Sequence, residues 1–380
     1  MSAATGTAAI GADRRADSGP ASGTSTTPRD AADPIRVAIV GASGYVGAEL
    51  VRLLSRHPAA RIVGLVGRER HGELIARFHP HLAGTGLTIT DAIPEDAETV
   101  FLALPHGASA RRVPELVGRG ISVIDMGPDF RLHDPADYPT WYGFDHPAPE
   151  LLGKAVYGLP ELHRAELRAL AAARETGREP VIVGSPGCYP TTALLALAPL
   201  AQAGLIGDLV VDAKSGVSGA GRDPKPHLHF TEIDESVSAY GLFTHRHTAE
   251  IEQELRRLSG DSQRVDFLPH LIPMVRGILS AGHVGPTRAV TQAEIDRLYE
   301  DAYGDEPFVT VVDAPPATKH VTGSNEARVH VRVNDRTGRI LAIGVLDNLV
   351  KGAAGQGVQA FNLVWDLPET TGLTQAPLAP

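Results

Sequence analysis

The sequence predicts an α/β protein in which a Rossmann-like dinucleotide-binding domain precedes an α+β catalytic domain with a mixed or antiparallel sheet. Residues 35–66 have the pattern strand, glycine-rich turn, helix and strand, which is the βαβ unit that binds dinucleotide phosphates. From residue 208 onward, short apolar or alternating runs replace this pattern, as in a mixed or antiparallel sheet. The chain has 380 residues, more than one compact core usually holds, so two domains are expected.

The composition is that of an ordinary globular protein, with 21% charged and 43% hydrophobic residues. The formal net charge of −10 argues against a nucleic acid or an anionic membrane as a partner. An acidic small molecule is compatible with it, but local Arg, Lys or His side chains must then hold that molecule. The single cysteine excludes an internal disulfide and a cysteine-rich zinc site, and it suits the reducing cytoplasm. No apolar run is long enough to span a membrane, and we predict no metal site.

Residues 1–34 form a separate segment that is rich in small and polar residues and lacks apolar periodicity. It contains no hydrophobic region of a secretory signal, and no apolar segment follows Arg14-Arg15, as twin-arginine export requires. Acids such as Asp13 and Asp17 disfavour a transit peptide, which is usually poor in acids. We therefore predict a disordered extension.

The first predicted unit is a strand at 35–40, a glycine turn, a helix at 48–57 that stops at Pro58, and a strand at 61–66. The glycines are spaced G-x-x-G-x-x-G rather than the commoner G-x-G-x-x-G, and a tight turn without a ligand would use similar residues. The flanking strand and helix favour a cofactor site at the helix N-terminus. The predicted cofactor-binding residues of this turn are Gly41, Ser43, Gly44, Tyr45, Val46 and Gly47.

The loop after the second strand bears on the choice between NAD and NADP. An NAD site usually places an acidic residue near this point to bind the ribose 2′-hydroxyl, whereas here Arg68, Glu69 and Arg70 follow the strand. Arg68 and Arg70 suit a 2′-phosphate, which predicts NADP. The alternatives are a solvated charged loop, or an NAD site that uses Glu69.

Two further apolar strands in this half, at 99–104 and 121–124, are followed by His106 and Arg131. Because the carboxyl ends of parallel strands line the ligand crevice, both residues are candidate neighbours of the site. Either is equally compatible with an ordinary loop position. A helix is predicted at 161–173.

The only cysteine lies in the segment Gly184-Ser-Pro-Gly-Cys-Tyr-Pro190. A β-branched strand at 181–183 precedes it, and an apolar helix at 191–203, which Pro199 bends or ends, follows it. Cys188 is therefore predicted beside a helix N-terminus, where free N–H groups favour a thiolate. A lone cysteine is more often a small buried apolar residue, but the flanking Gly and Pro allow a substrate to approach closely.

The second half begins with a strand at 209–213 and a glycine-rich segment at 214–222, which is either a second ligand contact or a loop. His245, Arg246 and His247 precede a predicted helix at 249–258 whose N-cap is expected to be Thr248. Such a group is typical of an anion or proton-transfer site, although surface histidines are a serious alternative in a chain with 16 of them. Further strands are predicted at 265–268, 277–284, 308–313, 327–333 and 340–346, with a last helix from 347 to 363.

Taken together, these segments resemble the N-acetyl-gamma-glutamyl-phosphate reductase family, which is related to aspartate-semialdehyde dehydrogenase. The resemblance covers residues 36 to about 366, and the order and spacing of its motifs are more specific than any one of them. The motifs are Gly41-Ala-Ser-Gly-Tyr-Val-Gly47, Tyr157-Gly-Leu-Pro-Glu161, Gly184-Ser-Pro-Gly-Cys-Tyr-Pro-Thr191, Lys214-Ser-Gly-Val-Ser-Gly-Ala-Gly-Arg222, His245-Arg-His-Thr248, Pro273-Met-Val-Arg-Gly277 and Asp347-Asn-Leu-Val-Lys-Gly-Ala-Ala-Gly355. The chain departs from the family in its N-terminal extension and in Ala249, where the family often has proline.

The resemblance implies a domain order of 1–34 extension, 35–187 NADP-binding domain, 188–346 catalytic and dimerisation domain, and 347–380 returning to the first domain. It implies NADPH-dependent reduction of an acyl phosphate to an aldehyde in arginine biosynthesis, by a homodimer or homotetramer. Cys188 is the implied nucleophile and His247 the acid/base, with His245 and His283 as alternatives for the latter. Implied cofactor contacts in the second half are Ser218, Gly219 and Asn348. Candidates for the anionic groups of the substrate are Arg131, Arg222, His245, Arg246 and Arg276, which the sequence does not rank.

Other functions stay open at this stage. One is a related reductase that acts on carrier-bound aminoadipyl phosphate or on aspartyl phosphate. Another is a Cys–His acyl transferase or hydrolase that merely keeps a nucleotide fold. A non-catalytic NADP sensor is disfavoured by the intact Cys–His pair.

Overall fold

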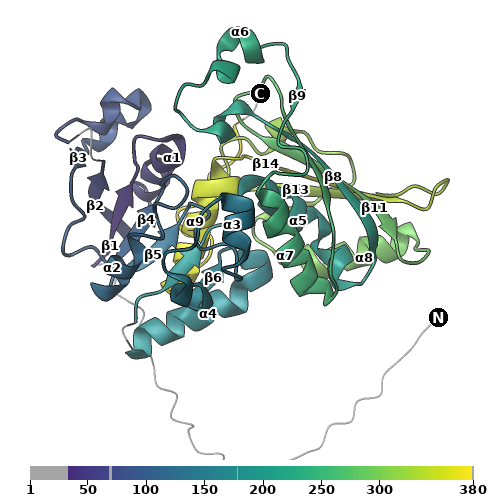
Figure 1. The fold of residues 1–380 in the computed structure, drawn as a ribbon, viewed down its shortest axis with the longest axis horizontal. Coiled ribbons are helices and arrows are strands. Elements are labelled where there is room, and N and C mark those ends of the chain that lie inside the picture. Colours follow the sequence, from purple (N-terminus) through teal and green to yellow (C-terminus); the bar gives the residue numbers. More distant parts are fainter. Residues whose placement is uncertain (1–32, 68–70, 178, 379–380) are drawn as a thin grey trace, which may run out of the picture. The chain divides into compact units, whose positions relative to one another are not determined.

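The first half of the chain folds into a parallel seven-stranded sheet with the strand order β3-β2-β1-β4-β5-β7-β6 (Figure 1). The computed structural model describes residues 33–67, 71–177 and 179–378, so the predicted extension at 1–34 lies almost wholly outside the described residues. The strands are β1 (Ile35–Val40), β2 (Ala60–Val66), β3 (Ile89–Thr90), β4 (Thr99–Leu102), β5 (Ser122–Asp125), β6 (Ala155–Tyr157) and β7 (Ile182–Gly184). This is the parallel, Rossmann-like sheet that the sequence predicts.

Helices cover both faces of this first sheet. The core on one face joins the sheet to α1 (Tyr45–Leu54), α4 (Pro160–Gly177) and α9 (Gly355–Val364). The core on the other face contains α2 (Val113–Gly118), α3 (Asp137–Tyr142) and the loops around them. The last helix, α9, thus packs against α4 and α1 although it follows the second sheet in the chain.

The second half forms a mixed seven-stranded sheet with the order β12-β13-β14-β11-β8-β10-β9. Its strands are β8 (Ile206–Ser215), β9 (Ser238–Ala239), β10 (Asp266–Leu271), β11 (Ile278–Pro286), β12 (Val309–Val311), β13 (Ala327–Val333) and β14 (Ile340–Leu346). The pairs β8/β10 and β12/β13 are parallel and the remaining pairs are antiparallel. The expected mixed sheet is therefore confirmed, and with it the fold class.

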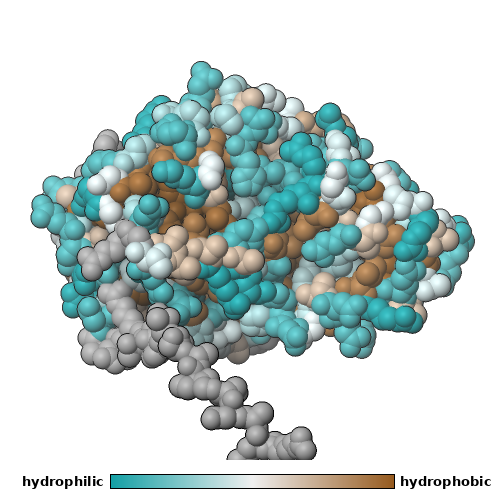
Figure 2. Space-filling view, turned by 90° about the horizontal axis from the view of Figure 1, so that it is seen from below, coloured by the Kyte–Doolittle hydropathy of each residue, from teal (hydrophilic) through white to brown (hydrophobic). Residues whose placement is uncertain are grey.

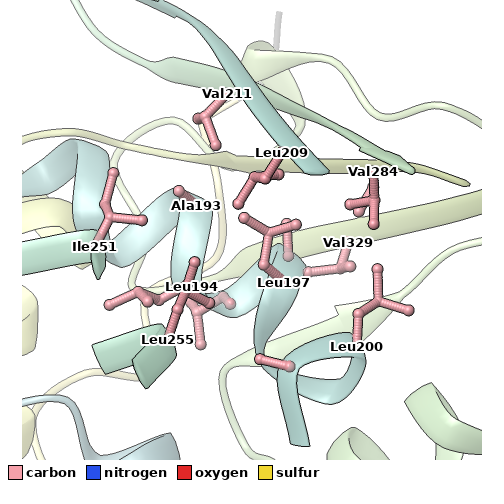
Figure 3. Close-up of a cluster of buried hydrophobic side chains, with 14 of the residues drawn as sticks. Ala193, Leu194, Leu197, Leu200, Leu209, Val211, Ile251, Leu255, Val284 and Val329 are labelled. Atoms are coloured by element: carbon pink, nitrogen blue, oxygen red, sulfur yellow. The ribbon is translucent and has the colours of Figure 1, made fainter. Parts of the chain in front are cut away.

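The core of the second half lies between this sheet and α5 (Cys188–Gln202), with α7 (His247–Ser259) and α8 (Gln292–Tyr303) beside it. Figure 3 shows leucines of α5, such as Leu194 and Leu197, among side chains of α7 and of the strands. Shorter helical elements of this half include α6 (Phe230–Ile233) and 3-10 turns at Val217–Ala220, Pro226–Leu228 and Thr318–His320, and a π-helix at Val350–Ala354 leads into α9. Helix α8 has no counterpart among the predicted elements.

Pro199 neither ends nor breaks α5, which continues to Gln202. A proline in a helix removes the N–H that would bond to the carbonyl four residues earlier, here that of Leu195. The Tyr303 hydroxyl of α8 donates a hydrogen bond to this carbonyl at 2.6 Å. The side chain of a neighbouring helix therefore satisfies the acceptor that the proline leaves open.

The helix predicted at 249–258 begins earlier, at His247, and Arg246 occupies its N-cap position. Thr248 lies in the first turn, and its hydroxyl has no hydrogen-bond partner within the described part of the chain. The prediction of Thr248 as the N-cap was wrong. Because the helix begins at His247, its first turn fixes the backbone of this residue.

The face of the molecule in Figure 2 carries hydrophobic patches between larger areas of hydrophilic residues. Among the described residues, no helix has both the length and the apolar character needed to cross a membrane.

Candidate active site

A cavity of about 970 Å³ receives residues from both halves of the chain. On the side of the first sheet, its walls come from the carboxyl ends of β1, β4 and β5, where a parallel sheet binds its ligands. On the other side, they come from the start of α5, the segment after β8 and the start of α7. The predicted site residues that line it are Gly41, Gly44, Tyr45, Val46, Gly47, His106, Arg131, Cys188, Ser218, Gly219, Arg222, His245, Arg246, His247 and Asn348.

The glycine turn after β1 has the shape of a phosphate cradle. Gly41 has a φ of +85°, and a Cβ at this position would lie 2.2 Å from the carbonyl oxygen of Ala103. A Cβ at Gly47 would lie 2.3 Å from the Gly41 carbonyl. Gly44 is the N-cap of α1, and no side chain caps that helix. The N–H groups of the first turn are therefore free to bind an anion.

Ser43 of the same turn contributes through its backbone and does not line the cavity. Its carbonyl accepts a hydrogen bond from His79 Nε2 at 2.9 Å and one from Arg222 at 3.4 Å. Arg222 thus bridges from the second half to the cradle. The predicted cofactor residue Arg68 lies outside the described residues.

Asn348 holds together the second set of predicted cofactor residues. Its Oδ1 accepts a hydrogen bond from the Gly277 N–H at 2.7 Å, and its Nδ2 donates to Ser218 Oγ at 2.9 Å. A Cβ at Gly219 would lie 3.3 Å from Ser215 Oγ, which is a tight contact, and 3.7 Å from Asn348 Nδ2, which is an ordinary one. The Asn348 amide therefore fixes the turn at 217–220 against the cavity.

Cys188 is the first residue of α5, with Gly187 as its N-cap. The backbone packs tightly around it, since a Cβ at Gly352 would lie 2.8 Å from the Cys188 Cβ. Burial raises the pKa of the thiol to about 11, although Arg131 and nearby backbone N–H groups lower it in part. The expectation of a resting thiolate was wrong, because loss of hydration outweighs the helix N-terminus.

His247 is the first residue of α7, and its ring packs against the backbone just before Cys188. A Cβ at Gly187 would lie 2.4 Å from His247 Nε2, so only glycine allows this approach. Burial lowers the pKa of His247 well below its usual value, and the neighbouring cations act in the same direction. Its Nδ1 is buried and has no partner among the described residues. The resting site therefore pairs a neutral thiol with a neutral imidazole.

His245 packs beside His247 on the cavity wall. Its Nδ1 accepts a hydrogen bond from the His247 N–H at 3.2 Å, and its ring packs edge-on against Tyr189 and Phe267. Burial, helped by Arg246, lowers its pKa to about 4. The other alternative, His283, lies exposed on β11 and does not line the cavity.

The candidate substrate arginines differ in what their guanidinium groups already bind. Arg246 donates to His106 Nδ1 at 2.8 Å, across the cavity from one half of the chain to the other. Arg131 lines the cavity but is buried, and it donates to Ser185, Glu250 and Met126. Its pKa is raised because the carboxylate of Glu250 offsets the cost of burial.

Arg276 is not part of the cavity wall. Its guanidinium forms ion pairs with Glu49 of α1 and with Asp347, the latter at 3.5 Å. The structure therefore places it as a link between the two halves, and we drop it as a substrate ligand.

Family models match both halves of the chain. A model described as "Semialdehyde dehydrogenase, NAD binding domain" covers residues 36–170, and one described as "Semialdehyde dehydrogenase, dimerisation domain" covers residues 188–348. The N-acetyl-gamma-glutamyl-phosphate reductase of Desulforudis audaxviator is 46% identical over 355 residues, which cover 91% of this chain and 100% of the relative. The protein of the same name from Pelotomaculum thermopropionicum is also 46% identical, over 91% of this chain and 99% of its own. The chain belongs to the N-acetyl-gamma-glutamyl-phosphate reductase family.

More distant proteins of known structure share the fold of this chain. Aspartate semialdehyde dehydrogenase II from Vibrio cholerae superposes with a TM-score of 0.66 at 20% identity, covering 87% of this chain and 98% of its own. Aspartate semialdehyde dehydrogenase with NADP from Candida albicans gives a TM-score of 0.65 at 15% identity, with the same coverage. At these identities the likeness establishes the fold alone.

Sequence reasoning missed two features of this site. Lys225 and His227 line the cavity from a loop that carried no recognised motif. Glu250, which is fully buried and contacts the segments around Cys188 and His247, was not singled out. A signal for it existed, because His247 and Glu250 are three residues apart and share one face of a helix.

Proposed function

We propose that this chain reduces N-acetyl-L-glutamyl 5-phosphate to N-acetyl-L-glutamate 5-semialdehyde and phosphate with NADPH, as a step of arginine biosynthesis. One observation carries the proposal. The His247 ring packs against Gly187, which directly precedes Cys188, on the wall of the cavity that also contains the glycine cradle. A nucleophile and a proton-transfer group are thereby placed beside a site suited to a dinucleotide. The names of the relatives supply the substrate.

The first step forms a bond between Cys188 Sγ and the acyl carbon of the substrate. His247 accepts the thiol proton as this bond forms, the C–O bond to the phosphoryl group breaks, and inorganic phosphate leaves. The product of this step is a thioester on Cys188. A neutral imidazole is the form that accepts a proton, which agrees with the lowered pKa of His247.

NADPH, when bound, supplies the hydride that reduces this thioester. The glycine cradle, Ser218, Gly219 and Asn348 are the residues that would hold it, and the missing Cβ atoms at Gly41 and Gly47 let the backbone of the cradle pack closely enough to form this turn. Backbone N–H groups at the start of α5 would stabilise the resulting oxyanion. The oxyanion then re-forms the carbonyl, the C–S bond breaks, the aldehyde leaves, and His247 returns the proton to the Cys188 thiolate.

Cationic side chains on the cavity wall would receive the anionic groups of the substrate. Arg246 keeps donors free beyond its bond to His106, because a guanidinium carries five N–H groups. Arg222 and Lys225 also line the cavity. An arginine fork suits both phosphate and carboxylate, so we propose Arg246 and Arg222 as the main anion ligands. Arg131 is better suited to positioning, since its donors are already used in the protein.

The reverse reaction tests the function. Purified protein is mixed with N-acetylglutamate semialdehyde, NADP and phosphate, and NADPH formation is followed at its absorbance maximum. We expect turnover that depends on all three components, and a substrate panel with aspartate semialdehyde and a carrier-bound aminoadipate semialdehyde should give much less. Turnover with one of those substrates instead would move the assignment to a related reductase. Acyl transfer without any change in nicotinamide absorbance would favour a transferase or hydrolase.

The preference for NADP gives a separate prediction, based on the Arg68 side chain expected near a 2′-phosphate. We expect Arg68→Ala to weaken NADP binding by about one to two decades and to leave NAD binding nearly unchanged. The loss corresponds to about 1.5–3 kcal/mol, as for hydrogen bonds to charged groups. Arg70 shares the same loop, so the single substitution should give the lower figure. Titrations with both dinucleotides measure the effect. Equal weakening of NADP and NAD binding would mean that Arg68 does not bind the 2′-phosphate.

We also propose that the chain works as a homodimer or homotetramer in the cytoplasm. The face of the second sheet that points away from α5 carries half-buried apolar residues, among them Val210, Leu279 and Ile343. A second copy covering this face would bury them, and the matched family model of this region is described as a dimerisation domain. Light scattering with size-exclusion chromatography gives the mass directly. A reducing compartment keeps Cys188 as a free thiol.

A further inference from the structure

Glu250 is a fully buried carboxylate that the reaction above does not use. It lies in the first turns of α7, three residues after His247, and its side chain has no exposure to solvent. It is absent from the cavity wall. Burying a carboxylate is costly unless hydrogen bonds and positive charge compensate it, so its surroundings reveal what it holds in place.

Each oxygen of this carboxylate is engaged. Oε2 accepts hydrogen bonds from the Gly187 N–H and from the Tyr157 hydroxyl, both at 3.0 Å. Oε1 accepts from Arg131 at 3.0 Å and lies 3.8 Å from His247 Nε2. The partners come from four separate segments of the chain.

Two of these partners, Gly187 and His247, belong to the segments that carry the two reacting groups. Gly187 directly precedes Cys188 and is the N-cap of α5. Arg131 donates to the carbonyl of Ser185 at 2.6 Å, which fixes the same segment from the other side. His247 belongs to the same helix as Glu250. The Glu250 carboxylate therefore connects the backbone beside Cys188 to the helix that carries His247.

We propose that Glu250 is a positioning residue for the reductase reaction, which sets the approach of Cys188 to His247 and balances the charge of Arg131 beside the thiol. The positioning role rests on the proposed function. The charge balance between Glu250 and Arg131 does not, because it is a property of the free protein. The two parts of the proposal are separable, since one depends on the hydrogen bonds that both carboxylate oxygens accept and the other on the negative charge alone.

The charge balance acts on the Cys188 thiol. Arg131 lowers the pKa of Cys188 and Glu250 raises it, in addition to the larger effect of burial. The other titratable groups near the thiol are His247 and the phenols of Tyr189 and Tyr240. Removing the negative charge of Glu250 leaves Arg131 uncompensated and should make the thiol more acidic.

The experiment measures alkylation of the free protein by iodoacetamide as a function of pH. Cys188 is the only thiol in the chain, so the rate reports this residue alone. With Glu250→Gln we expect alkylation at pH 8 to be about tenfold faster than in the wild type, because a neighbouring charge shifts a pKa by about one or more. The shorter Glu250→Asp keeps the charge, and its midpoint should stay near that of the wild type.

Turnover supplies the second measurement. Both variants should lose kcat, by about 10- to 100-fold, because a small displacement of a reacting group is costly. The KM for NADP should stay unchanged, since Glu250 does not line the cavity. If the protein turns out not to be a reductase, the alkylation result still decides the charge balance.

Glu254→Gln is the matched control. Glu254 lies one turn further along α7, is also fully buried, and accepts a hydrogen bond from His163 at 2.7 Å. Its substitution removes a buried carboxylate from the same helix without touching the segment of Cys188, and the alkylation midpoint should not move. The proposal is overturned if Glu250→Gln leaves the midpoint unchanged. It is equally overturned if Glu250→Asp or Glu254→Gln lowers the midpoint as much, since general loosening would then be the cause.

Discussion

We expect Cys188→Ser to lose about 10²-fold or more of the reductase activity. A hydroxyl at the start of α5 is far less acidic than a thiol and lacks the nucleophilicity of a thiolate. The structure strengthens this expectation, because burial already raises the pKa of the thiol to about 11 and a serine in the same surroundings would be harder still to deprotonate. His247 then has no readily removed proton to accept.

Alkylation gives an independent measurement of the same group. A reagent that modifies the single thiol should abolish turnover, and the acyl phosphate should protect against it by occupying Cys188. Because the pKa is raised, alkylation of the free protein should be slow at neutral pH and should accelerate up to about pH 11. A Cys188→Ala protein that still forms aldehyde at the normal rate would remove the covalent mechanism, and NADP titration of that variant verifies that its cofactor site is intact.

The parts of the fold that the sequence predicts are those fixed by local patterns. Gly41 and Gly47 lie where a side chain would collide with backbone, so their spacing reflects the turn itself. The β-branched runs of both sheets are long enough to be recognised as strands. Helix α8 was missed although the sequence marks it, since Ile295, Tyr299 and Tyr303 recur at helical spacing and Thr291, whose side chain caps the first turn, stands directly before it.

The parts that the sequence does not predict depend on pairs of residues far apart in the chain. Arg276 is 227 residues from Glu49, and nothing local distinguishes a guanidinium that links two halves from one that binds substrate. Likewise, Arg131 and Glu250 are 119 residues apart. The protonation state of Cys188 is the sharpest case, since its helix position favours a thiolate while burial, which only the folded chain reveals, favours the thiol.

His247→Asn carries the other large effect, and we expect it to lower turnover by about 10²–10⁴-fold while leaving the fold and NADP binding intact. Proton transfer by a positioned residue contributes about this much. The asparagine keeps a polar side chain at the start of α7 but cannot accept the proton of Cys188. Single-turnover measurements of phosphate release would localise the loss to the first step, in which the thiol must be deprotonated.

The pH dependence distinguishes a lost base from a disturbed site. Without His247, attack depends on the small fraction of Cys188 that is ionised in solution, and this fraction rises about tenfold per pH unit below a pKa of about 11. The residual activity of His247→Asn should therefore climb steeply between pH 7 and pH 9, whereas the wild type should change much less over the same range. His245→Asn is the matched control, since His245 is not the proposed acceptor of the thiol proton and its Nδ1 accepts a hydrogen bond from the His247 N–H at 3.2 Å. It should lose less activity and keep the wild-type profile. If the large loss and the steep profile belong to His245→Asn instead, the acid/base is His245, and His247 only packs against Gly187.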